Sequence, residues 1–170
     1  MAIATLALSA VAFVGILTRE DYTDRAIIPT QGDRPTKGFG STVGEDGKPV
    51  KMGDRTTPVA AARLAISHIE GDEAQIKQCV RVPLHQAEYD AYVDLAYNIG
   101  AFNFCTGGRA GGTSGIVRRL NAGDYVGACN AILDWKFAAG FDCSTPGNKR
   151  CAGVWTDRQR VHKQCMEAQQ

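Results

Sequence analysis

Residues 19–42 read REDYTDRAIIPTQGDRPTKGFGST, and this polar stretch separates two parts of the chain that differ in character. Glycine, proline, aspartate and threonine recur through residue 55, with short apolar runs between them. This pattern predicts turns and short strands, arranged as a small hairpin or a three-stranded sheet. Pro35 and Pro49 favour turns and sheet edges, because proline has no backbone N–H to offer a central strand.

Helical patterns fill the chain after this stretch. Thr57 followed by Pro58 predicts a helix start, with threonine as the N-cap. The 3.6-residue period places a set of apolar residues on one face of this helix: Ala61, Leu64, Ala65 and Ile69. Because the strands and the helices are segregated along the sequence, we predict an α+β fold in one domain spanning residues 1–170.

Three further helices are expected towards the C-terminus. The first runs from Pro83 to a terminating Gly100, and its predicted buried stripe comprises Leu84, Ala87, Ala91, Leu95 and Ala96. The second is capped by Asp124 and continues to Trp135, and the third covers residues 156–165. Residues 107–115 are rich in glycine and lack the features of a phosphate-binding loop, so we expect an ordinary loop there.

The composition excludes some classes of protein. Apolar residues make up 44% and charged residues 22% of the 170 residues, which is typical of a globular domain. The net charge is only +1, whereas a nucleic-acid binder needs a basic face, so we expect no nucleic-acid partner. An acidic substrate stays open, because a cleft can be locally basic in a neutral protein.

The six cysteines are scattered along the chain, and none forms a Cys-x-x-Cys pair. An even number of scattered cysteines favours disulfides and an oxidising compartment over a zinc site. Reduced, buried thiols are the alternative. The best local pair is Cys143 with Cys151, and the other four cysteines allow three pairings.

Residues 2–17 form an uncharged segment rich in alanine, leucine and valine. As a helix it would extend about 24 Å, which is shorter than the roughly 30 Å hydrocarbon core of a bilayer. No basic region precedes it, so a cleavable signal peptide fits poorly. A weak membrane segment that can leave the bilayer again and a buried first helix are equally good interpretations.

Glu20 lies where this apolar segment meets the polar stretch. A carboxyl group in partly apolar surroundings is desolvated, which raises its pKa and suits a general acid. The like charge of Asp21 acts in the same direction. From position alone, an exposed glutamate near a helix end is the more ordinary interpretation.

The quoted stretch resembles the active-site segment of the phage-type lysozymes, glycoside hydrolase family 24. Glu20 matches the family's catalytic acid, and residues 36–40, TKGFG, match its threonine motif. The resemblance continues downstream in LHQAEYDAYVDLAYNIG, LNAGDYVGACNAILDW and GVWTDRQRVHKQC. It implies a lysozyme-like fold with an N-terminal helix, a small β-sheet lobe and a mostly helical lobe.

The chain departs from this family at two places. The position of the second catalytic residue, normally Asp or Cys, is Thr30 here, and the nearest acid is Asp33. Either Asp33 acts as the second carboxylate, or Thr30 and Thr36 hold the attacking water without one. Asp33 could equally be a turn residue bonded to its own backbone. Of the two arginines usual in the closing helix, only Arg158 is present, since Asp157 occupies the other position.

The resemblance also implies roles for other residues. Gly38, Phe39 and Asn98 are expected to bind or orient the substrate, and Arg158 is expected to pair with Glu20. No cofactor is required. The three histidines lie on different predicted helices and lack the spacing of metal ligands, so we expect no metal site. Trp135 follows an apolar helical stripe and is expected to belong to the core, and the tyrosines at positions 89, 92 and 97 to the core or to the edge of the cleft.

These observations predict an endolysin that hydrolyses the β-1,4 bonds between N-acetylmuramic acid and N-acetylglucosamine in peptidoglycan and so lyses the host. A lytic transglycosylase and a non-catalytic wall-binding domain are the alternatives. The segment over residues 2–17 resembles the anchors of signal-anchor-release endolysins, which implies a transient inner-membrane tether and action in the host periplasm. We expect the protein to be a monomer.

Overall fold

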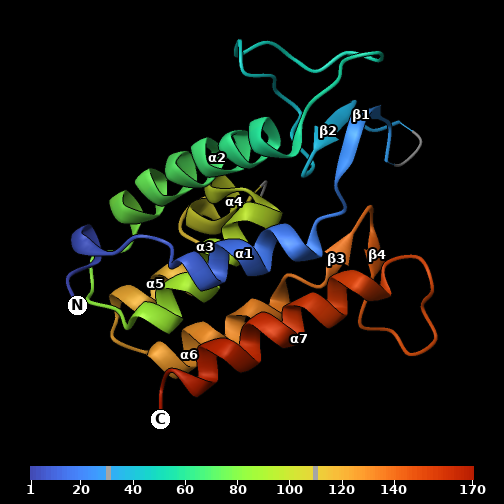
Figure 1. Cartoon of the computed structure of the whole chain (residues 1–170). Coiled ribbons are helices and arrows are strands. Elements are labelled where there is room, and N and C mark those ends of the chain that lie inside the picture. Colours follow the sequence, from blue (N-terminus) through green and yellow to red (C-terminus); the bar gives the residue numbers. More distant parts are fainter. Residues whose placement is uncertain (30–31, 109–110) are drawn as a thin grey trace. The chain divides into compact units, whose positions relative to one another are not determined.

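The computed structural model describes residues 1–29, 32–108 and 111–170 (Figure 1). The chain forms two compact units, one made of Ala10–Gly71 and the other of Met1–Ser9 with Asp72–Gln170. The predicted α+β class is confirmed, because two small antiparallel sheets accompany the helices.

The unit Ala10–Gly71 holds the predicted polar hairpin. It comprises α1 (Ala10–Arg19), β1 (Thr23–Ile27), β2 (Thr36–Gly38) and the first part of α2 (Pro58–Cys79). β1 and β2 pair in antiparallel fashion with an irregular register between Thr23 and Ile27. A third strand does not form among the described residues, where only the isolated bridge of Arg25 with Arg55 extends the pairing beside β1. The hairpin prediction is therefore confirmed and the three-stranded alternative is not.

The start of α2 follows the prediction closely. The backbone N–H of Ala60 donates to Thr57 Oγ1 at 3.2 Å, so threonine caps the helix as expected. Ala61, Ala65 and Ile69 are buried, and Leu64 is half-buried. The helical period thus identified the face that packs.

The N-terminal segment differs from the continuous helix expected over residues 2–17. A short 3-10 helix, η1 (Ile3–Thr5), comes first, and α1 begins only at Ala10. The backbone N–H groups of Leu8 and Ser9 donate instead to the carboxylates of Glu73 and Asp90, at 2.8 and 3.0 Å. Within the described residues, no helix has both the length and the apolar character needed to cross a bilayer.

Helix α3 (Gln86–Ile99) is the central helix of the second unit, and it is buried on all sides from Glu88 to Ala96. It begins later than predicted because Leu84 pairs with the N-terminus: its N–H donates to the Met1 carbonyl at 3.0 Å, and its carbonyl accepts from the Met1 ammonium at 2.8 Å. The predicted end at Gly100 is confirmed. Ala87, assigned to the buried stripe, is exposed, whereas the other four members are buried.

Two short helices were missed by the sequence analysis. α4 (Ala101–Thr106) follows Gly100 directly, and α5 (Gly115–Asn121) begins inside the segment read as a loop. The Ser114 hydroxyl caps α5 by accepting from the Val117 N–H at 3.1 Å. Both helices are too short to show a clear apolar period, which is why the sequence pattern did not identify them.

The C-terminal part confirms the cap at Asp124, whose Oδ1 accepts from the Gly127 N–H at 2.9 Å. Helix α6 (Tyr125–Asn130) then tightens into the 3-10 helix η3 (Ala131–Asp134). A hairpin of β3 (Phe137–Ala138) and β4 (Phe141–Asp142) follows, which the sequence analysis did not predict. The last helix, α7 (Ala152–Glu167), begins before the expected Thr156.

All six cysteines form disulfides, and all three bonds lie within the second unit. The predicted Cys143–Cys151 bond is confirmed. The other two bonds join Cys79 to Cys105 and Cys129 to Cys165. The sequence alone could not choose this pairing among the three that were open.

Candidate active site

Glu20 is the first residue after α1, and its backbone N–H still donates to the Ile16 carbonyl at 3.1 Å. Its side chain is half-buried. A Cβ atom added to Gly40 would lie 3.6 Å from Glu20 Oε2, so the carboxylate faces the end of the threonine motif. The structure therefore brings together two of the features that the sequence placed in one site.

The threonine motif, TKGFG, forms β2 and the turn that follows it. The turn is closed by Lys37 and Ser41, whose backbones exchange two hydrogen bonds of 3.0 Å each. Gly38 has a φ of +64°, and a Cβ there would lie 2.6 Å from the Ala61 Cβ, so only glycine fits. Because Gly38 is buried, its part is to shape the turn that carries the neighbouring residues.

Phe39 lies in the same turn, where its ring packs against Tyr22 with centroids 5.4 Å apart and planes tilted by 52°. This geometry is a usual one for an aromatic pair. The predicted contact of Phe39 with substrate stays a prediction.

The second catalytic position is less sharply defined. Thr36 starts β2 and is half-buried, and its hydroxyl has no hydrogen-bond partner among the described residues. Asp33 is exposed, and its carboxylate likewise has no partner within residues 1–29, 32–108 and 111–170. The Asx-turn interpretation of Asp33 therefore finds no support in that part of the chain. Thr30 lies outside the described residues.

Arg158 and Asn98 are in direct contact, an interaction that the sequence did not predict. Arg158 is buried, and its guanidinium donates through Nη2 to Asn98 Oδ1 and through Nη1 to Asp157 Oδ2, the latter at 2.8 Å. Burial lowers the pKa of Arg158, and the charge of Asp157 opposes this shift. Asp157 also accepts from Arg160, which reaches on to Asp94 at 2.8 Å. Pairing of Arg158 with Glu20 stays a prediction.

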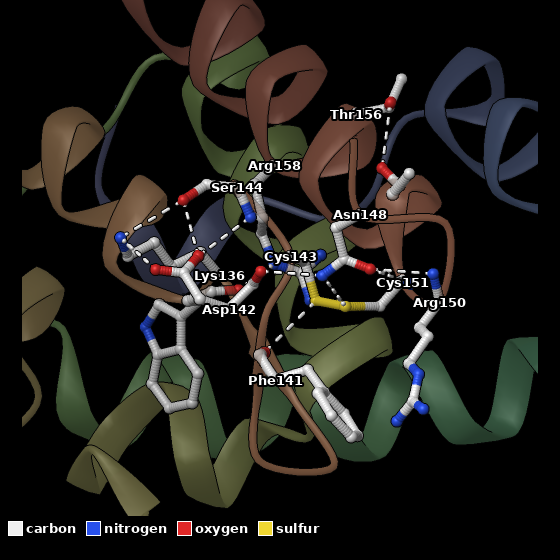
Figure 2. The surroundings of a disulfide bond; sticks show 12 residues. Lys136, Phe141, Asp142, Cys143, Ser144, Asn148, Arg150, Cys151, Thr156 and Arg158 are labelled. Carbon is white, nitrogen blue, oxygen red and sulfur yellow. Dashed lines mark hydrogen bonds and ion pairs between the residues drawn. A yellow bond between two sulfur atoms is a disulfide. The ribbon is translucent and has the colours of Figure 1, made fainter. Parts of the chain in front are cut away.

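The third donor of Arg158 is Nε, which binds the backbone carbonyl of Trp135 at 3.0 Å. Figure 2 shows the segment that follows Trp135, which contains the β3–β4 hairpin and the loop closed by the Cys143–Cys151 disulfide. Asp142 anchors this segment by accepting from Lys136 at 2.8 Å and from the Ser144 hydroxyl at 2.6 Å. The Lys136 contact, with help from Ser144, lowers the pKa of Asp142 to about 2.

Trp135 does not belong to the core as the sequence analysis expected. It is half-buried and lines an open cavity of about 390 Å³ together with Asp134 and Phe137. Phe137 is 62% exposed and was not singled out from the sequence. The i, i+2 spacing of the two aromatic rings, in a segment reading WKF, is the signal that could have identified it.

One group of potential metal ligands occurs among the described residues: Glu88, Cys129 and Cys165. The two sulfurs are bonded to each other, so they are not thiolates and cannot ligate a metal. Glu88 is buried, which raises the pKa of its carboxyl.

A family model described as phage lysozyme matches residues 17–160, which include every described residue of the candidate site. The chain belongs to the phage lysozyme family. This is the family whose active-site segment resembles Glu20 and residues 36–40 of this chain.

Among the relatives of this phage lysozyme, the endolysin of Salmonella phage P22 is 38% identical over 104 residues, covering 61% of this chain and 66% of that protein. The SAR-endolysin of Enterobacteria phage P21 is 28% identical over 127 residues, covering 75% of this chain and 68% of that protein. The solved endolysin from Escherichia coli O157:H7 phage FAHEc1 has a TM-score of 0.77 at 27% identity, covering 96% and 95% of the two chains. The chain is thus a peptidoglycan-hydrolysing endolysin, a glycoside hydrolase of the muramidase type that causes host lysis.

Proposed function

We propose that Glu20 is the general acid for cleavage of the β-1,4 bond between N-acetylmuramic acid and N-acetylglucosamine. The observation that carries this proposal is the position of the Glu20 carboxylate next to Gly40, at the end of the threonine motif. In this reaction Glu20 gives its proton to the leaving glycosidic oxygen while water attacks the anomeric carbon from the opposite face. The result is inversion at that carbon.

Thr36 is the residue that orients the attacking water. Its hydroxyl is half-buried at the start of β2 and is not used by another described side chain, so it can accept from and donate to a water molecule. The third member is Asp33 or Thr30. Asp33 can take the proton that the water loses, whereas Thr30 can only help to hold the water.

Arg158 and Asn98 would orient the substrate or the acid, because the contacts of Arg158 hold its side chain in one position. The arginine is fixed by three acceptors from separate segments, namely Trp135, Asn98 and Asp157. A guanidinium held this way loses little side-chain conformational entropy when it binds an oxygen of the substrate or of the acid. The mixed aromatic and acidic lining beside Trp135 suits the apolar and polar faces of a sugar ring.

Mass analysis of the muropeptides released from purified walls tests the reaction. Hydrolysis yields reducing N-acetylmuramic acid ends. A lytic transglycosylase, the alternative left open by threonine in place of an acid at position 30, yields ends that are lighter by one water because the sugar's own hydroxyl attacks. A wall-binding domain without activity releases no product and still sediments with the walls.

We infer that the N-terminus supports a transient tether to the inner membrane, followed by release into the periplasm. Val11 and Val14 of α1 are 84% and 60% exposed, so this helix presents apolar surface that a bilayer could cover. Several relatives, including that of phage P21, are named SAR-endolysins.

The contacts of Met1–Ser9 describe what release would form. Asp90 accepts from both the N–H and the hydroxyl of Ser9, at 3.0 and 2.6 Å, and Glu73 accepts from the Leu8 N–H at 2.8 Å. Gln86 donates to the Ala7 carbonyl and to Asp90, at 2.8 Å each. While this segment lay in a bilayer, these carboxylates would lose those partners, so the contacts favour the released state.

Replacing Gly15 with leucine tests the tether. A Cβ at Gly15 meets only the end of the Arg19 side chain, at 3.1 Å, so the variant is compatible with the folded state while its segment is more apolar. We expect it to fractionate with membranes and to delay lysis relative to wild type and to a Gly71→Leu control outside the segment. Wild type and Gly15→Leu both wholly soluble before depolarisation would overturn the tether and leave the muramidase assignment intact.

A further inference from the structure

A second cavity, of about 630 Å³, lies in the unit that contains the disulfides. Its wall comes from the end of α2, the end of α4, and α5. The polar side chains that line it are Gln78, Arg81, Thr106, Thr113, Arg118 and Asn121. None of the described residues that line it is acidic, so the charged side chains among them are the two arginines, Arg81 and Arg118.

The wall of this cavity is cross-linked. The Cys79–Cys105 disulfide joins the end of α2 to α4 and lines the cavity itself. Asn121 ties α5 to the same place: its Oδ1 accepts from the Arg81 N–H at 2.8 Å, and its Nδ2 donates to the Cys79 carbonyl at 2.9 Å. A ligand would therefore meet a preformed site and would not have to order three segments.

The two arginines are available for an anion. Neither guanidinium makes an ion pair or hydrogen bond to any residue in the part of the chain that the structure describes. The neighbouring Arg119 behaves differently, because it pairs with Asp124 at 2.9 Å. In a protein whose net charge is only +1, two arginines in an acid-free cavity form a locally positive site.

We propose that this cavity binds a carboxylate of a peptidoglycan stem peptide. The proposal rests on the wall being the substrate, since the stem peptides bring free carboxylates wherever the enzyme works. Arg81 and Arg118 present planar guanidinium groups, which match a carboxylate in geometry and charge. The side chains of Gln78 and Thr113 can bond the peptide's amide groups, which a free ion would not use.

Amide spectra of the isotope-labelled, full-length protein test this inference with three probes at one ionic strength. The probes are the tripeptide L-alanyl-γ-D-glutamyl-L-lysine, the same tripeptide with its carboxyls amidated, and inorganic phosphate. We expect the free-acid tripeptide to shift the amide signals of Arg81, Arg118 and Asn121, and the amidated tripeptide to leave them unchanged. Arg81→Gln and Arg118→Gln should each weaken binding about tenfold, since each removes a charge-assisted contact.

Arg119→Gln is the matched control, because Arg119 lies on the same helix but is not part of the cavity wall. Its affinity for the tripeptide should equal that of wild type, and unchanged melting temperatures should show that all three variants fold. The inference is overturned if these signals do not move, if the amidated tripeptide binds equally well, or if phosphate binds at least as tightly as the free acid. Because binding and not bond cleavage is measured, any of these results leaves the muramidase assignment untouched.

Discussion

The two units of this phage lysozyme differ in what they contain: one holds the proposed acid and water-orienting residues, and the other holds the disulfides. The unit Ala10–Gly71 carries Glu20, Asp33 and Thr36, yet its sheet has only two short strands and its chain contains no cysteine. The unit with Asp72–Gln170 contains α3, which is buried from Glu88 to Ala96, and holds all three disulfides. The proposed acid and water-orienting residues thus lie in the unit without disulfides, while the covalent cross-links are concentrated in the other unit.

Removal of the Cys129–Cys165 disulfide tests the stabilising side of this comparison and should have the largest effect in free energy. The sequence separations are 36 for this bond and 8 for Cys143–Cys151. Loop-closure entropy then predicts a loss of about 4 kcal/mol for Cys129→Ala with Cys165→Ala, against about 2.5 kcal/mol for the shorter loop. Thermal unfolding of the two double variants measures the difference. Equal losses, or a larger loss from the shorter loop, would contradict it.

Thr36→Val tests the chemical side. Because the hydroxyl has no partner among the described residues, valine keeps the shape and should leave the melting temperature unchanged. Loss of the water-orienting group should lower the rate of wall digestion about a hundredfold. Thr42→Val, an exposed threonine of the same unit, is the control and should digest walls at the wild-type rate. Comparable rates for the two variants would remove Thr36 from the mechanism.

Asp33→Asn should have a smaller effect, about tenfold in rate, if Asp33 takes the proton of the attacking water. The carboxylate is exposed and has no partner within the described residues, so the substitution should cost no stability. Glu45→Gln provides an exposed acid of the same unit as the control. A wild-type rate for Asp33→Asn would move the third role to Thr30.

Glu88→Gln should have the smallest effect, and its sign depends on pH. Burial raises the pKa of Glu88 above its ordinary value of 4.5, so the unfolded chain releases this proton first as the pH rises. Wild type therefore loses stability as the pH increases from about 4.5 through the raised pKa, and glutamine removes this dependence. Denaturant unfolding at pH 4 and pH 7 should show equal stability at the lower pH and a more stable variant at the higher one. A variant that is less stable than wild type by the same amount at both pH values would contradict the expectation.

Sequence pattern predicted the parts of the fold that depend on local rules. The cap at Thr57, the end of α3 at Gly100 and the cap at Asp124 are each set by residues close in sequence. The start of α1 at Ala10 was missed, because side chains distant in sequence, Glu73 and Asp90, take the backbone groups before it. Such long-range hydrogen bonds leave no periodic signal.

The candidate site shows the same limit. The residues around Glu20 were identified from one contiguous stretch, whereas the close approach of Gly38 to Ala61, which gives this glycine a part in shaping the turn, appears only in the structure. The cavity beside Trp135 was not foreseen, because it depends on how η3, α5 and β3 pack. A tryptophan at the end of an apolar helix pattern reads as core, and only the structure reveals its exposed face.

Digestion of purified walls in water enriched in oxygen-18 tests the central claim most directly, which is hydrolysis with Glu20 as the acid. The wild-type protein should place one labelled oxygen on the anomeric carbon of each new N-acetylmuramic acid end. Glu20→Gln, which keeps the shape but cannot give the proton, should produce about a thousandfold fewer such ends. Unlabelled anhydro ends from the wild type, or labelled ends formed at an undiminished rate by Glu20→Gln, would contradict the account.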